Sequence, residues 1–242
     1  MKTKTLTLIL ASFSLMIYSC DVIDEHVIPD HNVTTQQATF SDYDMIEASH
    51  AFTVYVSFSD TEESIEIEAN NNLHQYIEVK KENSVLKIGF DRNINIRGSA
   101  TLNAYITTKH VSGYAGSGAA RFVVEDAIDA EEANIYLSGA SAFTGKLFVD
   151  RLYADLSGAA VINIDGSSDL FDLEASGASK VRDYGFNTKT LRAELSGASN
   201  MYITVHEEID IEASGASSLY YKGPAVIIRQ DLSGASSVKK MN

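Results

Sequence analysis

One stretch of the sequence decides the fold: residues 191–201 read LRAELSGASNM. Its first part alternates apolar and charged residues from Leu191 to Leu195, and the apolar Met201 follows beyond the tripeptide Ser-Gly-Ala. Alternation with a period of two is typical of a β-strand that buries one face. The stretch therefore predicts two short strands joined by a tight turn at Gly197.

The tripeptide recurs through the second half of the chain. Its seven copies, 18 to 21 residues apart, start at Ser117, Ser138, Ser157, Ser176, Ser196, Ser214 and Ser233. The residue five positions after each serine is apolar in every copy, and apolar residues predominate one, three and five positions before it. We therefore predict an all-β protein, a right-handed parallel β-helix or β-solenoid with about 19 residues in each rung.

The tripeptide also predicts the corner between the two strands of a rung. Glycine adopts a positive φ without steric cost, and small neighbours keep the corner thin enough for rungs to stack. The position after the alanine is always Ser or Ala, and we predict that its serine hydroxyls form hydrogen bonds from rung to rung. His50 takes the place of the glycine in the related segment 46–51, so the same corner is not predicted there.

The beginning of the chain has the features of a bacterial lipoprotein signal peptide, predicted to span residues 1–19. Lys2 and Lys4 precede an apolar core that is too short to span a membrane. Cys20, the only cysteine of the chain, follows a lipobox-like segment and is the predicted lipidation site. An ordinary secretory signal with an incidental cysteine is the alternative. Lipidation predicts a protein anchored to the outer membrane, on its surface or its periplasmic face.

Three further regions follow. Residues 20–38 are acidic and polar and predict a tether between the lipid and the folded domain. Residues 39–112 alternate less regularly and predict a β region, either degenerate rungs or a cap with antiparallel hairpins. Residues 113–242 contain the Ser-Gly-Ala repeats and predict the solenoid itself.

The charge of the chain excludes one class of partner. The formal net charge is −14, and residues 1–20 contain two lysines and no acid, so their removal leaves −16. A chain of this charge repels nucleic acid and anionic headgroups. We therefore expect no nucleic-acid partner, and contact with a membrane only through the lipid anchor.

Two residues before the tripeptide, five copies have a carboxylate. These residues are Asp155, Glu174, Glu194, Glu212 and Asp231. Rungs in register would align these carboxylates on an outward face. Arg192 and Arg229, two residues further back, could reach two of them. The column is a candidate face for a cation or a basic ligand. A solvated acidic face is the favoured interpretation, because no compact calcium loop accompanies it.

Aromatic residues form a second candidate surface. Tyr202 and Tyr220 share the position six residues after the serine, and Tyr221 follows directly. Surface tyrosines bind sugar rings or protein, although such residues more often cover neighbouring strands.

No motif predicts catalysis, a metal site or a cofactor. The six histidines are scattered, and neither a zinc motif nor a nucleophile elbow nor a phosphate-binding loop is present. Two acidic clusters have the residue types of a β-helix enzyme that cleaves polysaccharides; they are Asp129, Glu131 and Glu132, and Glu207, Glu208 and Asp210. Because both clusters lie in variable connections between rungs, we expect a protein that is not an enzyme.

Several segments resemble the family named putative auto-transporter adhesin, head GIN domain. They are residues 40–58, 77–79 and 85–88 together with the tandem Ser-Gly-Ala-Ser copies, and the resemblance covers roughly residues 38–235. It implies an exported β-helical protein or lipoprotein of the Bacteroidetes type, of unknown function. It implies no catalytic residue.

We therefore expect a non-catalytic binding or adhesin-like module at the cell envelope, with a cell-surface glycan or a protein as its partner. A structural β-helix that associates with copies of itself is the first alternative, although Lys239 and Lys240 near the end of the last rung oppose such stacking. A polysaccharide-active enzyme is the second alternative.

Overall fold

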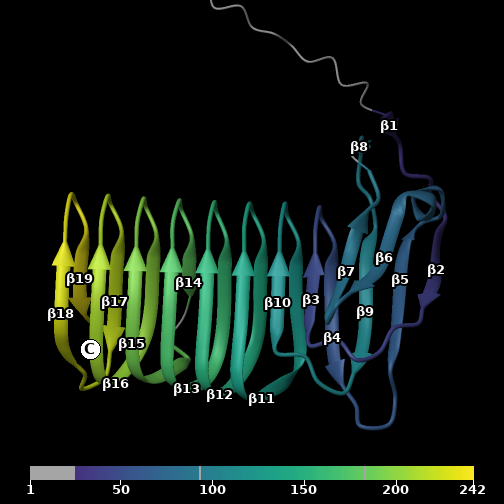
Figure 1. The fold of residues 1–242 in the computed structure, drawn as a ribbon. Coiled ribbons are helices and arrows are strands. Elements are labelled where there is room, and N and C mark those ends of the chain that lie inside the picture. Colours follow the sequence, from purple (N-terminus) through teal and green to yellow (C-terminus); the bar gives the residue numbers. More distant parts are fainter. Residues whose placement is uncertain (1–24, 93, 183) are drawn as a thin grey trace, which may run out of the picture.

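The computed structural model describes residues 25–92, 94–182 and 184–242 (Figure 1). Within these residues the chain forms 19 strands and one short 3₁₀ helix, η1 (Asn71–Tyr76). The predicted signal peptide and Cys20 lie outside the described residues. The prediction of an all-β solenoid is confirmed.

Each rung contributes one strand to each of two parallel walls that face one another (Figure 1). The strands that lead into the corners form the pre-corner wall: β7 (Val85–Phe90), β3 (Met45–Ala48), β10 (Gly113–Gly116), the second parts of β11 (Arg121–Leu137), β12 (Ala142–Leu156) and β13 (Val161–Ala175), β15 (Phe186–Leu195), the second part of β16 (Asn200–Ala213), and β18 (Val226–Leu232). The strands that leave the corners form the post-corner wall: β9 (Leu102–Thr108), β4 (Thr53–Phe58), the first parts of β11, β12 and β13, then β14 (Lys180–Arg182), the first part of β16, β17 (Ser218–Lys222) and β19 (Ser237–Lys240).

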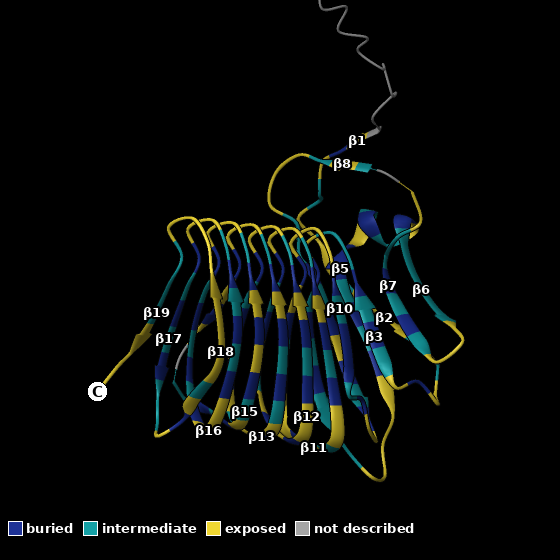
Figure 2. Ribbon diagram, turned by 60° about the vertical axis from the view of Figure 1, so that its left-hand side comes forward, coloured by how far each residue is buried: buried dark blue, intermediate teal, exposed yellow. Residues whose placement is uncertain are grey.

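The core fills the space between the walls (Figure 2). Because strands of successive rungs pair in parallel and in register, inward residues at the same repeat position stack on one another. Phe122, Phe143 and Ile162 lie side by side in this way and are fully buried. Burial of such side chains stabilises the fold by about 1.5–3 kcal/mol each. A single rung has no neighbour to cover this face, so stability comes from stacking.

The glycine of each Ser-Gly-Ala forms a corner as predicted. All seven glycines have φ between +69° and +74°. The alanine after each glycine donates its backbone N–H to the corner residue of the preceding rung, with N–O distances of 2.5–2.7 Å. A Cβ atom on Gly158 would lie 2.7 Å from the carbonyl oxygen of Gly139. A side chain at this position therefore conflicts both with φ and with the neighbouring rung.

The chain also forms the corner at His50, although the sequence of residues 46–51 did not predict one there. Its φ is +64°, and its carbonyl accepts the N–H of Ala119 in the next rung. Histidine is among the residues that tolerate this conformation best after glycine. Its ring packs edge-on against Phe90 at 4.8 Å and lies 2.8 Å from the hydroxyl of Ser49. The rung of β3 and β4 is thus a true rung of the solenoid.

The serine hydroxyls after the alanine do not bond to one another, and the predicted hydrogen bonds from rung to rung form only in part. Each donates to the carbonyl of the first serine of its own corner, as in Ser179 to Ser176 at 2.7 Å. Among the described residues at this position, Ser217 and Ser236 also reach a carbonyl of the preceding rung. The carbonyl three residues back is the nearest acceptor, so the hydroxyl closes the turn locally.

The N-terminal end is covered by antiparallel strands, one of the two alternatives that the sequence left open. β6 (Ile77–Glu82) pairs antiparallel with β7 at the end of the pre-corner wall. β5 (Ser64–Asn70) pairs antiparallel with β9 at the end of the post-corner wall. Antiparallel strands thus cover the end of the parallel stack, and residues 39–112 contain both a cap and one rung.

Part of the predicted tether, residues 20–38, forms strands, which corrects that boundary. Residues 33–38 form β2 (Val33–Ala38), which pairs antiparallel with β5. β1 (Glu25–Val27) pairs with β8 (Ile94–Ile96). The side chains of β2 are exposed or half-buried, and its sequence shows no apolar alternation. Backbone pairing with the sheet edge at β5 holds the strand in place.

We predict that Gly158→Ala lowers the free energy of unfolding by at least about 1–2 kcal/mol, the cost of a left-handed conformation for a residue with a Cβ. Denaturant unfolding followed by circular dichroism measures the change. Ala159→Ser, at the exposed next position of the same corner, is the matched control and is expected to lie within about 0.5 kcal/mol of wild type. Equal stability of the two variants would contradict the role assigned to the corner.

Candidate functional site

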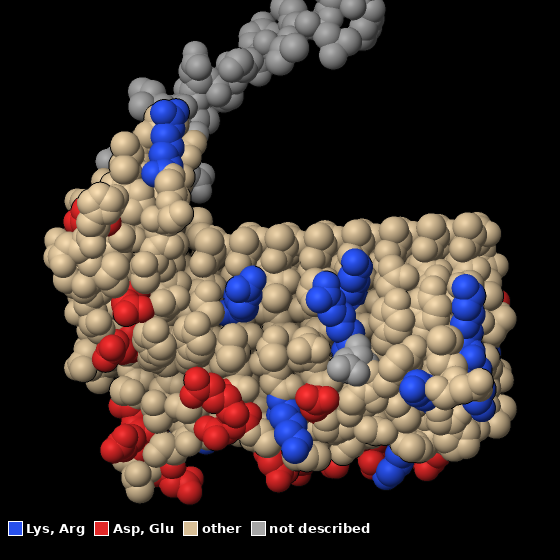
Figure 3. Space-filling model, turned by 180° about the vertical axis from the view of Figure 1, so that it is seen from behind, with Lys and Arg blue, Asp and Glu red and all other residues tan. Residues whose placement is uncertain are grey.

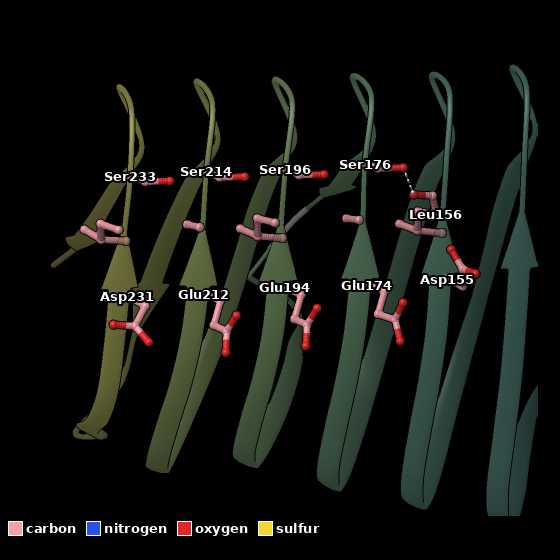
Figure 4. A pocket seen from close by; sticks show the side chains of 14 residues that line it. Asp155, Leu156, Glu174, Ser176, Glu194, Ser196, Glu212, Ser214, Asp231 and Ser233 are labelled. Carbon is pink, nitrogen blue, oxygen red and sulfur yellow. Dashed lines mark hydrogen bonds between the residues drawn. The ribbon is translucent and has the colours of Figure 1, made fainter.

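The five predicted carboxylates form one ladder on the outside of the pre-corner wall (Figure 4). Asp155 pairs with Glu174, Glu174 with Glu194, Glu194 with Glu212, and Glu212 with Asp231 in the strand register. With the serines that begin the corners, they line an open groove of about 390 Å³. The structure therefore brings together the residues that the sequence singled out.

Neighbouring side chains balance the ladder only in part. The Arg229 guanidinium pairs with Glu212 and lies 3.3 Å from an oxygen of Asp231. Arg192, expected to reach a second carboxylate, forms no ion pair with the residues that the structure describes. The Tyr153 hydroxyl donates to Glu174 at 3.2 Å, and burial together with the Glu174 charge raises the pKa of Tyr153 to about 12.

At Asp155, the surroundings disfavour the charged form of the carboxylate. Burial, and then the charge of Glu174, raise its pKa above the ordinary value of 3.8. No group of three or more His, Cys, Asp or Glu side chains among the described residues is arranged to hold a metal ion. The ladder offers a basic partner a row of acceptors, but it does not form a coordination site.

The two acidic clusters considered for catalysis lie on the outside of the molecule. Glu132 pairs with Arg151 at 3.9 Å, and Asp210 lies 3.8 Å from Arg229. Glu207 and Glu208 are exposed. The ion pairs of Glu132 and Asp210 are ordinary surface ion pairs.

The aromatic candidates separate into two groups. Tyr202 and Tyr220 lie side by side on the outside of the post-corner wall, with ring centroids 4.8 Å apart and planes 8° apart. Tyr221 is 6% exposed and points into the core, which corrects its assignment to the contact surface. The reason is the strand period of two, because adjacent residues point to opposite faces.

Tyr184, which the sequence analysis missed, completes the surface. Its ring meets Tyr202 edge-on, with centroids 5.8 Å apart. It follows the short strand β14, where the repeat has a step of 20 residues and the chain leaves the regular register. This irregular step is the signal in the sequence that marks the position.

The faces of these rings are occupied by neighbours. The Lys222 ammonium lies 4.8 Å from the centre of the Tyr184 ring, and the Lys239 ammonium lies 5.5 Å from that of Tyr220. Tyr202 lies between Tyr184 and Tyr220. Tyr184, Tyr202 and Tyr220, which we call the tyrosine ladder, therefore present ring edges and phenolic hydroxyls to the outside, together with the cations beside them.

Next to the tyrosine ladder, the post-corner wall has an open hollow of about 490 Å³. Its lining residues are Lys180, Arg182, Tyr184, Asn200 and Tyr202. Figure 3, seen from behind, shows basic side chains spread over this wall, whereas the acidic side chains gather at its capped end and lower edge. We call the surface formed by these residues with Tyr220, Lys222 and Lys239 the basic tyrosine wall.

Parallel rungs, a capped end and open grooves on the walls define a β-solenoid that presents its surfaces laterally. Residues 42–225 match the model of the family described as putative auto-transporter adhesin, head GIN domain, and the chain belongs to this family. No curated protein sequence matches the chain.

Solved structures share the fold. A putative adhesin from Bacteroides fragilis has 18% sequence identity and a TM-score of 0.80, with 89% of this chain and 100% of that chain covered. A putative adhesin from Parabacteroides distasonis has 20% identity and a TM-score of 0.68, with 90% and 100% covered. A putative lipid binding protein from the same species has 17% identity and a TM-score of 0.69, with 90% and 100% covered.

The adhesin family and the fold are consistent with a non-enzymatic protein of the cell surface. Among the helices of the described residues, none has the length and apolar character needed to cross a membrane.

We predict that Asp155→Asn raises the melting temperature at pH 7. Because the folded state raises the pKa of Asp155, the native protein binds more protons than the unfolded chain above pH 3.8, so this residue destabilises the fold as the pH rises. The gain is expected to be less than about 1 kcal/mol and to vanish below the ordinary pKa.

Thermal unfolding at several pH values measures this gain. Asp231→Asn is the matched control, because Arg229 already donates to that carboxylate, and no gain is expected there. An Asp155→Asn effect that does not depend on pH would contradict the electrostatic explanation.

Proposed function

We propose that the protein is a non-catalytic, adhesin-like binding module of the cell envelope, anchored by a lipid on Cys20, which binds its partner through the post-corner wall. The observation that carries this proposal is the tyrosine ladder, three rings on successive rungs with an open hollow beside them. The family and its solved relatives named as adhesins support a binding role.

The fold suits such a role because the wall is rigid. Tyr202 and Tyr220 extend from paired strands whose opposite faces are fully buried, so their side chains are held in place before a partner arrives. A surface ordered in advance loses little conformational entropy on binding. Aromatic side chains with a polar tip are also the residues that most often contribute to interfaces.

We predict that Tyr202→Ala together with Tyr220→Ala reduces binding to the preferred glycan by at least about tenfold. A glycan array identifies that glycan with the wild-type protein, and titration calorimetry then compares the variants. The matched control is Tyr55→Ala, because Tyr55 and Tyr105 form another stacked pair, 5.1 Å apart, away from the hollow. Unchanged binding by the double variant, or an equal loss in the control, would remove this ladder from the proposal.

The lipid anchor has a separate test. In a bacterial host that processes lipoproteins, we expect the wild-type chain to incorporate labelled fatty acid and to fractionate with the outer membrane. Cys20→Ser should abolish both, because no other cysteine is present to carry the lipid. Ser19→Ala, one residue earlier, is the control. Membrane association of Cys20→Ser equal to that of wild type would overturn the anchor.

A further inference from the structure

The basic tyrosine wall gathers four cations on one surface of the protein. Lys180, Arg182, Lys222 and Lys239 form no ion pair with any described residue. On the pre-corner wall and the cap, by contrast, Lys87 lies 3.1 Å from Glu82, and Arg229 contacts three carboxylates. In a chain of net charge −14, this surface thus has four basic residues without an acidic partner among the residues that the structure describes.

The register shows why no acid reaches them. One outward row of this wall consists of Lys180, Asn200, Ser218 and Ser237 on successive rungs. The next row contains Tyr202, Tyr220 and Lys239. Neither row has a carboxylate, whereas five consecutive rungs of the opposite wall each have one at a single position. In these two rows the stacked repeats therefore bring cations and tyrosines together without a carboxylate between them.

The groups that face the hollow are nearly all hydrogen-bond donors or cations. Lys180 and Arg182 bring an ammonium and a guanidinium to its rim, and both are exposed. The hydroxyls of Tyr202 and Tyr220 form no hydrogen bond with described residues, so they are available to a ligand. Such a surface is complementary to carboxylate, sulfate or phosphate oxygens.

We propose that the basic tyrosine wall binds an acidic polysaccharide, a linear glycan with carboxylate or sulfate groups. This inference rests on the proposed function and names its ligand class. Successive rungs are roughly 4.8 Å apart. The cations on β14, β17 and β19 are therefore spread along the solenoid axis. A chain with a negative group on its repeating unit contacts several of them at once, and its hydroxyls accept from the phenols.

Two other anionic partners fit this wall less well. Proteins that bind single-stranded nucleic acid stack its bases on open aromatic faces, but each of these three rings already has a neighbouring ring or ammonium against it. Peripheral membrane binding uses apolar side chains that enter the lipid. None of the exposed large apolar side chains of the described residues belongs to this wall. An acidic glycan needs neither base stacking nor insertion.

The test compares polygalacturonate with dextran of similar length, measured by titration calorimetry with the mature protein. We expect wild type to bind polygalacturonate and to bind dextran at least tenfold more weakly. Its affinity for polygalacturonate should fall as salt is raised from about 50 to about 500 mM, one decade around physiological ionic strength. Lys180→Gln with Arg182→Gln should weaken polygalacturonate binding by about tenfold, equal to about 1.4 kcal/mol.

The control removes the same charge elsewhere. Arg151→Gln with Lys189→Gln changes two cations that are paired with Glu132 and Asp169 away from the wall, and affinity should change less than about twofold. Circular dichroism and melting temperature establish that both double variants fold.

The outcomes separate this inference from the proposed function. Binding of a neutral glycan that depends on Tyr202 but not on Lys180 and Arg182 would overturn the acidic ligand and leave the binding module. Binding only to single-stranded DNA, or only to vesicles with anionic lipid, would overturn it in favour of those partners. No binding to any glycan, acidic or neutral, would count against both.

Discussion

Every rung of this protein depends on one contact, the backbone hydrogen bond from the alanine of each corner to the corner residue of the preceding rung. The contact is short because the corner has no side chain between the two backbones, and φ near +70° turns the carbonyl toward the next rung. His50 shows the limit of this requirement. It adopts the conformation at the first corner, where its side chain projects beyond the repeated glycines to pack on the cap.

The same stacking explains the surfaces. Rungs in register place equivalent side chains about 4.8 Å apart, so any residue type that recurs in the repeat becomes a row. On the pre-corner wall the row consists of carboxylates, and the repulsion between them is only partly relieved by Arg229 and Tyr153. On the post-corner wall it consists of tyrosines and cations. Because two adjacent tyrosines in such a row stack face to face, the ladder stabilises the wall while its hydroxyls point outward.

The cations gathered on the post-corner wall affect binding in a way that the net charge does not show. A net charge of −14 argues against polyanionic partners, yet the cations of the post-corner wall are shielded from most of the acids by the solenoid itself. Interactions between exposed charges weaken within a Debye length of about 8 Å in physiological salt. A polyanion on this wall therefore meets mainly the local basic surface, and orientation of the molecule at the cell surface becomes important for its contacts.

The sequence by itself determined the repeat, the period of the strands, the position of each corner and the register of the acidic ladder, because each of these follows from local spacing in residues 113–242. Only the tertiary structure decided what the irregular segments do. It put Tyr184 into the aromatic surface and Tyr221 into the core, made residues 33–38 a strand of the cap, and kept the corner at His50. These features depend on contacts between residues far apart in the chain. Local alternation of apolar and polar residues does not predict which neighbour will cover a face.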